Sequence, residues 1–377
     1  MKIAVNTRLL LKGKLEGIGL VTYEILRRVT RNHPEHEFYF LFDRKYSDDF
    51  LFSDNIIPLV VPPQSRLPIL WYTFFEISMP LAVRHVGADL LISTDGWTSI
   101  RAKVPKLTIF HDLNFEHSPE FIPPKTYRYL KKYVPEYAHA SDRIVAVSNY
   151  TKQDIVNTYN VPEEKIDVMH ISGSSSSIIE TVDDNTITEI KRRYTSGCDY
   201  FVFVGSLHKR KNVENQLLAF DKFKQQNEGS NVKFVIIGRK MWRNYSLDDV
   251  LSSMEHKDDV IFTGFIPSED VGKLVASSLA MLYVSLFEGF GMPLVEAFKL
   301  GVPVITSTTT SMPEVAGDAA LLVEPTNIDA IAEAMSSVYR DQNLRNVLIQ
   351  KGKERGKMFD WDISAEIFWQ SVEKVLR

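Results

Sequence analysis

With 377 residues, the chain is long enough for about two domains, and its 44% apolar residues supply material for buried cores. A net charge of −4 gives no general attraction to nucleic acid, so we expect no nucleic-acid partner. Cys198 is the only cysteine, which excludes an intrachain disulfide and fits a reducing compartment. The first apolar run is too short for a secretion signal, and no stretch reaches the roughly 20 apolar residues of a spanning helix. We therefore expect a cytoplasmic protein, and leave open a peripheral contact with the inner membrane face.

Short apolar strands alternate with longer amphipathic segments in the first half, which is typical of parallel α/β folds. The predicted strands are 3–6, 37–42, 59–61, 90–93, 107–111 and 144–148. An amphipathic helix is predicted over 20–29. A serine-rich segment at 172–177 leads through an acidic stretch into a charged helix near 188–194, and we place the domain junction there.

The second half repeats this alternation of short apolar strands and amphipathic segments. Its predicted strands are 200–205, 232–238, 260–263, 281–285 and 304–306. Helices are predicted over 328–339, on to about 358, and over the amphipathic tail 363–376. We predict two doubly wound Rossmann-like domains, the first covering 1–175 and the second 176–361. Ligands would bind in a crevice at the carboxyl ends of both sheets.

The segment Glu288–Glu296, which reads Glu-Gly-Phe-Gly-Met-Pro-Leu-Val-Glu, follows an apolar run predicted to be a buried strand. Its two glycines allow close approach of a ligand, and Pro293 suits the first turn of a helix. Main-chain N–H groups at the helix start would form an anion site for a diphosphate; they belong to Gly291, Met292, Leu294 and Val295.

Carboxylates flank this predicted phosphate site, because Glu288 leaves the strand before it and Glu296 lies about one helical turn beyond it. Acids suit hydroxyl-rich groups better than phosphate, for example a hexose and a ribose. The pattern therefore indicates a nucleotide-sugar site. Its predicted donor-binding residues are Gly289, Phe290, Gly291, Met292, Pro293, Leu294 and Glu296. The alternative is a plain strand–loop–helix turn whose acids complement the helix dipole.

A second strong feature is the run 204–212, which reads Val-Gly-Ser-Leu-His-Lys-Arg-Lys-Asn after a predicted strand. A glycine turn, a helix N-terminus and basic side chains together suit a pyrophosphate. We predict that Gly205 and Ser206 contact the donor and that Arg210 and Lys211 contact its phosphates. A solvated basic loop is the alternative, and we favour it for Lys209.

Two weaker signals lie in the first half. Gly17 and Gly19 precede the helix 20–29, but no third glycine completes a dinucleotide fingerprint, so a plain turn is equally compatible. His111 ends a predicted strand at its carboxyl end, where a functional histidine is more plausible than elsewhere. Most lone histidines are packing or surface residues.

We predict no metal site. Asp360-Trp361-Asp362 is the only Asp-x-Asp, and we interpret it as a helix start capped by Asp362, with a packed tryptophan. The histidines show no zinc spacing. Two segments, 66–81 and 125–137, mix basic and aromatic residues. Either segment could bind an acceptor glycan or anionic lipid. The simpler interpretation is that the aromatic side chains lie in the core and the basic side chains are exposed to solvent.

The Glu-x7-Glu segment around Gly-Phe-Gly-Met-Pro resembles the donor-binding motif of the family-4 retaining glycosyltransferases, also called glycosyl transferases group 1. Segments 148–151, 263–265 and 311–317 add to the match. The resemblance implies a GT-B fold of two facing domains, with the C-terminal helix 362–377 returning to the first domain. It also implies that a basic pair at 210 and 211 contacts the diphosphate and that Gly17 and Gly19 face it from the first domain.

In this family view His111 lies beside the transferred sugar, and the leaving phosphate helps to deprotonate the acceptor. The predicted catalytic residues are His111, Glu288, Lys211 and Arg210. The chain departs from the family pattern at Ser206, where many relatives have arginine, and at 170–174, where an Asn-Gly-Val turn is common and only Gly173 is kept.

We therefore predict a metal-independent, retaining hexosyltransferase of cell-surface polysaccharide synthesis. It would need no cofactor and would use GDP-mannose or a UDP-hexose as donor. A glycan or a lipid-linked molecule would be the acceptor. The alternatives are a nucleotide-sugar epimerase of the same fold and a catalytically silent partner subunit.

Overall fold

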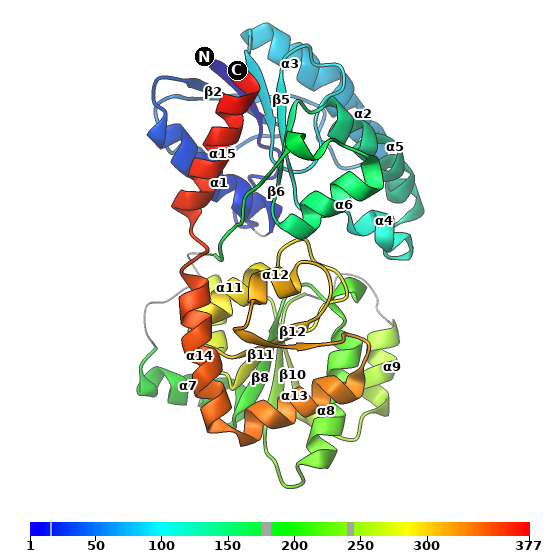
Figure 1. The fold of residues 1–377 in the computed structure, drawn as a ribbon, viewed down its shortest axis with the longest axis vertical. Helices are drawn as coiled ribbons and strands as arrows, with labels where there is room; N and C mark the ends of the chain where they lie inside the picture. The colour runs from blue at the N-terminus through cyan, green and yellow to red at the C-terminus, as the bar shows by residue number, and fades with distance from the viewer. Residues whose placement is uncertain (16, 175–181, 240–244) are drawn as a thin grey trace. The chain divides into compact units, whose positions relative to one another are not determined.

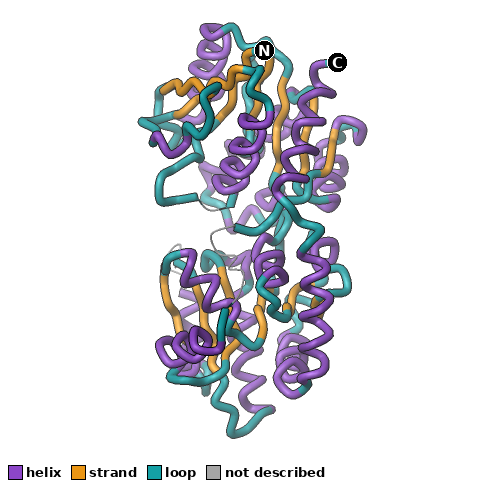
Figure 2. Tube along the Cα trace, turned by 90° about the vertical axis from the view of Figure 1, so that its left-hand side faces the viewer, coloured by secondary structure: helices purple, strands orange, loops and turns teal. Residues whose placement is uncertain are grey.

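The computed structural model describes residues 1–15, 17–174, 182–239 and 245–377. The chain forms two compact units (Figure 1). Unit 1 comprises Met1–Ile171 and Asp360–Arg377, and unit 2 comprises Ser172–Phe359. The junction predicted between residues 175 and 176 lies outside the described residues. In each unit, helices flank a set of parallel strands (Figure 2), which is the predicted doubly wound α/β arrangement.

Unit 1 contains a seven-stranded sheet in the order β3-β2-β1-β4-β5-β6-β7. Its strands are β1 (Lys2–Asn6), β2 (Glu37–Phe42), β3 (Ile56–Val60), β4 (Leu90–Ser93), β5 (Lys106–Phe110), β6 (Arg143–Ala146) and β7 (Ile166–Val168). Its helices are α1 (Ile18–Asn32), α2 (Pro68–Thr73), α3 (Met79–Val86), α4 (Asn114–His117), α5 (Pro124–Ala140), α6 (Asn149–Tyr159) and α15 (Trp361–Leu376). A π-helical turn, η2 (Phe74–Ser78), joins α2 to α3.

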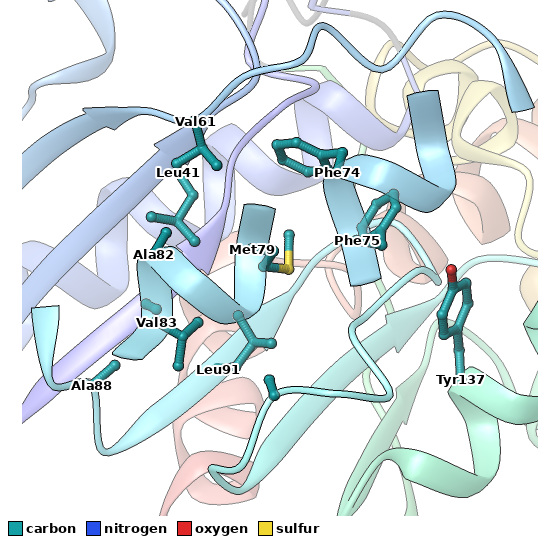
Figure 3. Close-up of a cluster of buried hydrophobic side chains, with 12 residues drawn as sticks. Leu41, Val61, Phe74, Phe75, Met79, Ala82, Val83, Ala88, Leu91 and Tyr137 are labelled. Carbon is teal, nitrogen blue, oxygen red and sulfur yellow. The ribbon is translucent and has the colours of Figure 1, made fainter. Parts of the chain in front are cut away.

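The core of unit 1 explains why its central strands are almost wholly apolar. Strands β4 and β5 are buried along their whole length, as expected when helices cover both faces of a parallel sheet. In register, Val5 of β1 lies between Phe40 of β2 and Ile92 of β4. Phe74, Phe75 and Met79 on the α2–η2–α3 segment belong to a buried cluster of this core (Figure 3).

The C-terminal helix α15 packs on unit 1 beside α1 (Figure 1), which confirms the predicted return of this helix. Trp369 stacks on His33 with ring centroids 3.6 Å apart, and Arg28 pairs with Asp362. The helix is capped by Asp360, whose carboxylate accepts from the amides of Asp362 and Ile363. The prediction that Asp362 is the cap was wrong by two residues, because Asp362 already lies inside the first turn.

Unit 2 contains a six-stranded sheet in the order β10-β9-β8-β11-β12-β13. Its strands are β8 (Tyr200–Val204), β9 (Lys233–Ile237), β10 (Val260–Gly264), β11 (Ala280–Tyr283), β12 (Val304–Ser307) and β13 (Ala320–Val323). Its helices are α7 (Asp184–Thr195), α8 (Val213–Gln226), α9 (Tyr245–Ser253), α10 (Ser268–Ala276), α11 (Met292–Lys299), α12 (Met312–Ala316), α13 (Ile328–Arg340) and α14 (Gln342–Gly356).

The strand order fixes where ligands can bind. In both sheets the chain runs outward on one side of the first strand and then crosses to its other side. The carboxyl ends on either side of this switch point form the usual ligand crevice of doubly wound sheets. In unit 1 the switch point lies between β1 and β4, and in unit 2 it lies between β8 and β11. The basic run 204–212 begins at the end of β8, and the loop to Glu288 follows β11.

Within the part of the chain that the structure describes, no helix combines the length and apolarity needed to cross a membrane.

Candidate active site

The switch point of unit 2 brings three predicted catalytic side chains together. One guanidinium nitrogen of Arg210 lies 2.7 Å from Oε2 of Glu288, and Nζ of Lys211 lies 2.6 Å from Oε1. Glu288 is only 6% exposed, and Lys211 is buried as well. Two cations around one carboxylate leave an excess positive charge, so the cluster is suited to attract an anion.

Local structure sets the position of the two cations. After β8, the backbone makes a 3-10 turn, η5 (Lys209–Lys211), capped by the ring of His208. Asn212 then adopts a left-handed conformation, and its side-chain amide donates to the carbonyls of Val284 and Pro325. The amide of Leu286 donates to the Arg210 carbonyl over 2.8 Å. The basic turn is therefore bonded directly to the loop that follows β11.

The Glu288 carboxylate is ionised over the whole physiological range. Burial alone would raise its pKa, but the charges of Arg210 and Lys211 outweigh burial and lower the pKa to about 2. Tyr283, at the end of β11, contributes a third partner, because its hydroxyl donates to Oε1 over 3.1 Å and accepts from Lys211. Burial and the Glu288 charge raise the pKa of Tyr283, so this hydroxyl keeps its proton.

Strand β11 ends at Tyr283, so Glu288 lies in a loop rather than at the end of the strand as predicted. The β12–α12 connection holds this loop. The Thr310 hydroxyl accepts from the Glu288 amide, and the Ser311 hydroxyl donates to the carbonyls of Glu288 and Phe290. Thr310 has a φ of 57°, which is a strained value for a β-branched residue. Sequence reasoning missed Tyr283 and Thr310 because both resemble ordinary core or turn residues.

Helix α11 begins as predicted, with Pro293 in its first turn after Gly291. Gly291 has a φ of 103°, and a Cβ there would lie 2.4 Å from the terminal methyl of Met312, so this position requires glycine. The Leu294 amide already donates to the Gly291 carbonyl, so it is not a spare donor for an anion. Gly289 and Phe290 are buried, and the Phe290 ring packs edge-on against Phe359.

Glu296 lies on α11 and contacts the segment that enters unit 2. Its Oε1 accepts from the Ser174 amide over 2.8 Å. A Cβ on Gly173 would lie 2.4 Å from Cγ of Glu296, so a larger residue at 173 would displace this carboxylate. This contact gives a physical reason why glycine stands at position 173, although the surrounding turn departs from the family pattern.

Three glycines that end neighbouring strands line the same edge of the sheet. The Gly205 amide donates to the Ile237 carbonyl, and the Gly238 amide donates to the Gly264 carbonyl. A Cβ on Gly238 would lie 1.8 Å from the Gly205 carbonyl oxygen, which excludes every other residue. Ser206 is half-buried beside this row. Gly238 was not among the predicted site residues, although its position as the last residue of the predicted strand 232–238 was an available signal.

The remaining predicted site residues belong to unit 1. His111 directly follows β5, and its Nε2 lies 2.8 Å from the Thr94 carbonyl. A carbonyl only accepts, so Nε2 carries the hydrogen; burial lowers the pKa of the ring. Gly17 precedes α1 with a φ of 50°, and a Cβ on Gly19 would lie 2.7 Å from the Leu9 carbonyl oxygen.

The switch point of unit 1 also holds a charged pair that sequence reasoning missed. The Arg8 Nε lies 2.6 Å from Oδ2 of Asp95, and the Asn6 amide donates to Oδ1 of the same carboxylate. The Arg8 guanidinium stacks 4.7 Å from the Trp97 ring centroid. Arg8 and Asp95 are 87 residues apart in sequence, so only the strand order brings them together.

Among the described residues, no three histidine, cysteine, aspartate or glutamate side chains converge as a metal site would require. Metal independence stays a prediction.

Two family models match the chain, one in each unit. The model described as glycosyltransferase family 4 matches residues 15–171, and the one described as glycosyl transferases group 1 matches residues 187–355. O-antigen chain mannosyltransferase B of Escherichia coli is 27% identical over 256 residues, covering 68% of this chain and 67% of the relative. O-antigen chain mannosyltransferase RfbU of Salmonella typhimurium is 28% identical over 278 residues, covering 73% of this chain and 72% of the relative.

Solved structures show the same fold at low identity. HepE of Anabaena, in complex with UDP and glucose, has a TM-score of 0.76 at 15% identity over 99% of both chains. Sucrose-phosphate synthase of Thermosynechococcus elongatus has a TM-score of 0.78 at 16% identity, covering 100% of this chain and 99% of the other. These similarities confirm the predicted GT-B fold. Matched by these two models across both of its units, the chain belongs to the family-4 glycosyltransferases.

Proposed function

We propose that the protein is a retaining hexosyltransferase. It transfers a mannose- or glucose-type hexose from a nucleotide diphosphate sugar to a glycan or lipid-linked acceptor of a cell-surface polysaccharide. The observation that carries the proposal is the buried cluster of Arg210, Lys211 and Glu288 beside the N-terminus of α11. The cluster combines an excess positive charge for a diphosphate with a carboxylate that can accept from sugar hydroxyls.

In this proposal, Arg210 and Lys211 stabilise the negative charge that grows on the diphosphate as the sugar leaves. Charge stabilisation by preorganised groups is a large contribution to catalysis, and it is stronger in a buried site than in water. The positive end of α11 adds to it through the Gly291 and Met292 amides. Positioning of donor and acceptor accounts for most of the remainder.

The bonds to Glu288 indicate which of its oxygens receives the sugar. Oε1 already accepts from Lys211 and Tyr283, whereas Oε2 accepts from Arg210 alone among the described residues. A carboxylate oxygen has two lone pairs. We therefore assign Oε2 to a hydroxyl of the transferred hexose. Glu296 is assigned to the ribose hydroxyls, with Ser174 holding its Oε1.

The relatives support the choice of donor and pathway. Two of them are named O-antigen chain mannosyltransferases, and the solved complexes of HepE contain UDP and glucose. Mannose from GDP-mannose is accordingly our first choice of substrate, and glucose from a UDP-hexose is the second. The epimerase alternative has no comparable support in this site.

The experiment has two parts. Thermal unfolding with a panel of nucleotide sugars identifies the donor, because a specific ligand at a hundredfold excess over its Kd adds about 2.7 kcal/mol of stability. Turnover is then measured for Glu288→Ala and Glu296→Ala. Each change removes a charge-assisted bond worth about 1.5–3 kcal/mol. Glu288→Ala should chiefly lower kcat and Glu296→Ala should chiefly weaken nucleotide binding; unchanged donor hydrolysis and transfer in both variants would refute the assignment.

A further inference from the structure

Tyr283 connects the sheet of unit 2 to the loop that carries Glu288. It is the last residue of β11 and is only 1% exposed. Its backbone is in register with Thr306 of β12, whose hydroxyl donates to the Tyr283 carbonyl over 2.9 Å. Its ring stacks on Phe203 of β8 with the ring centroids 5.9 Å apart. The strands on both sides of β11 therefore hold the phenol, so the position of its hydroxyl is fixed by close packing.

The Tyr283 hydroxyl contacts two of the groups that carry the proposed chemistry. It donates to Oε1 of Glu288 over 3.1 Å and accepts a hydrogen bond from the Lys211 ammonium. The same ammonium donates to Oε1 directly over 2.6 Å and lies 4.8 Å from the centroid of the Tyr283 ring. An ammonium has three N–H donors, so at most one of them remains for a phosphate. Lys211 is thus held by a buried phenol as well as by the carboxylate.

The same bonds determine how Glu288 faces a sugar. The last torsion of a glutamate side chain is soft and nearly two-fold, so a carboxylate with few partners exchanges its two oxygens. Here Oε1 accepts from both Lys211 and Tyr283, whereas Oε2 accepts from Arg210 alone among the described residues. Burial and the Glu288 charge raise the pKa of Tyr283, so its hydroxyl stays neutral and keeps donating. A neutral donor occupies Oε1 without adding a third positive charge to the site.

We propose that Tyr283 is a positioning residue for the transfer step, because its hydroxyl holds Glu288 in the orientation that presents Oε2 to the sugar. Tyr283 does not contact the substrate and acts only through Glu288. The inference rests on the proposed function, since it requires Glu288 to contact the transferred hexose. The alternative is a packing role alone, because any buried phenol needs a partner for its hydroxyl.

The first test is Tyr283→Phe, which removes one oxygen atom but keeps the ring, its stack on Phe203 and its contact with Lys211. Turnover is measured as hydrolysis of GDP-mannose, or of UDP-glucose if the thermal-unfolding panel selects it. Loss of a hydrogen bond to a charged group should lower kcat about tenfold. The affinity for the corresponding nucleoside diphosphate, measured by calorimetric titration, should stay the same, because Lys211 keeps its bond to Glu288.

Tyr200→Phe is the matched control. Tyr200 is fully buried at the amino end of β8, the edge of the sheet opposite the site, and its hydroxyl donates to the Leu274 carbonyl over 2.6 Å. Like Tyr283→Phe, this change removes one buried hydroxyl and its hydrogen bond from a strand of unit 2. The two variants should therefore lose similar stability in thermal unfolding. Only Tyr283→Phe should lose turnover.

A double-mutant cycle with Glu288→Gln separates this inference from the proposed function. If Tyr283 acts through Glu288, adding Tyr283→Phe to Glu288→Gln should lower kcat by less than about twofold. The inference is overturned if the two changes multiply, or if Tyr283→Phe lowers kcat no more than Tyr200→Phe while Glu288→Gln alone still impairs turnover. If Glu288→Gln itself leaves turnover unchanged, the proposed function fails and the inference fails with it.

Discussion

The carboxyl edges of the two sheets have the same topology but differ in their charge balance. In unit 2 the switch point holds two cations around one buried carboxylate. In unit 1 the switch point holds one cation, Arg8, paired with one acid, Asp95, and the nearby His111 has its pKa lowered by burial. The fold supplies two equivalent crevices, and the side chains that follow the switch-point strands decide which one suits a diphosphate.

The largest effect is expected when one partner of a buried pair is removed from each unit. Lys211→Met leaves Glu288 with Arg210 as its remaining cation, and Arg8→Met leaves Asp95 without its paired cation. Each should lower the free energy of unfolding, by up to about 3 kcal/mol. Only Lys211→Met should also weaken the binding of a nucleoside diphosphate. Equal losses of binding, measured by calorimetric titration on folded protein, would remove the proposed difference between the units.

The acid stability of unit 2 gives a second contrast, in which stability changes by a similar amount but only at low pH. The pKa of Glu288 is lowered from 4.5 to about 2, so its contribution to stability is complete above pH 4.5 and disappears as the pH falls through 2. In Glu288→Gln this contribution is absent. Between pH 5 and pH 2 the unchanged protein should therefore lose on the order of 3 kcal/mol more than the variant. The free energy of unfolding is measured by denaturant unfolding at several pH values in this window. If it falls with pH equally in the two proteins, the pairing of Glu288 with Arg210 and Lys211 is contradicted.

The sequence predicted most of the fold because hydrophobic runs and glycine turns are local signals. Strands β2 and β4 lie where the sequence placed them. The two strands that were missed, β7 and β13, are the short outer strands of their sheets and are only partly buried. An outer strand with a solvent-exposed edge does not need the continuous apolar run that marks a central strand.

The site was predictable where chemistry follows a motif and unpredictable where it depends on distant partners. Arg210, Lys211 and Glu288 could be selected from glycine turns and charge order, although the sequence did not show that the three bind one another. The Arg8–Asp95 pair and the Ser174–Glu296 bond join residues 87 and 122 positions apart, so only the tertiary structure reveals them. The same holds for the strained Thr310.

The smallest expected effect is in unit 1. The pKa of His111 is lowered by burial, so the folded state is favoured above the ordinary histidine pKa of 6.5 and loses stability as the pH falls below it. His111→Gln can keep the bond to Thr94 without titrating. Between pH 6.5 and pH 5 the unchanged protein should lose stability faster than this variant, by no more than about 1.4 kcal/mol per pH unit. If the stability of His111→Gln falls with pH at the same rate as that of the unchanged protein, His111 is not held neutral in the folded state.

The most direct test of the central claim is a calorimetric titration of the preferred donor and of its nucleoside diphosphate into the unchanged protein, Glu288→Gln and Glu296→Gln. Glu288 is assigned to the sugar and Glu296 to the ribose. Glu288→Gln should therefore weaken the donor selectively, whereas Glu296→Gln should weaken both ligands to a similar extent. If Glu288→Gln leaves the affinity ratio of the two ligands unchanged, the buried carboxylate does not hold the sugar, and the proposed role of Glu288 is wrong.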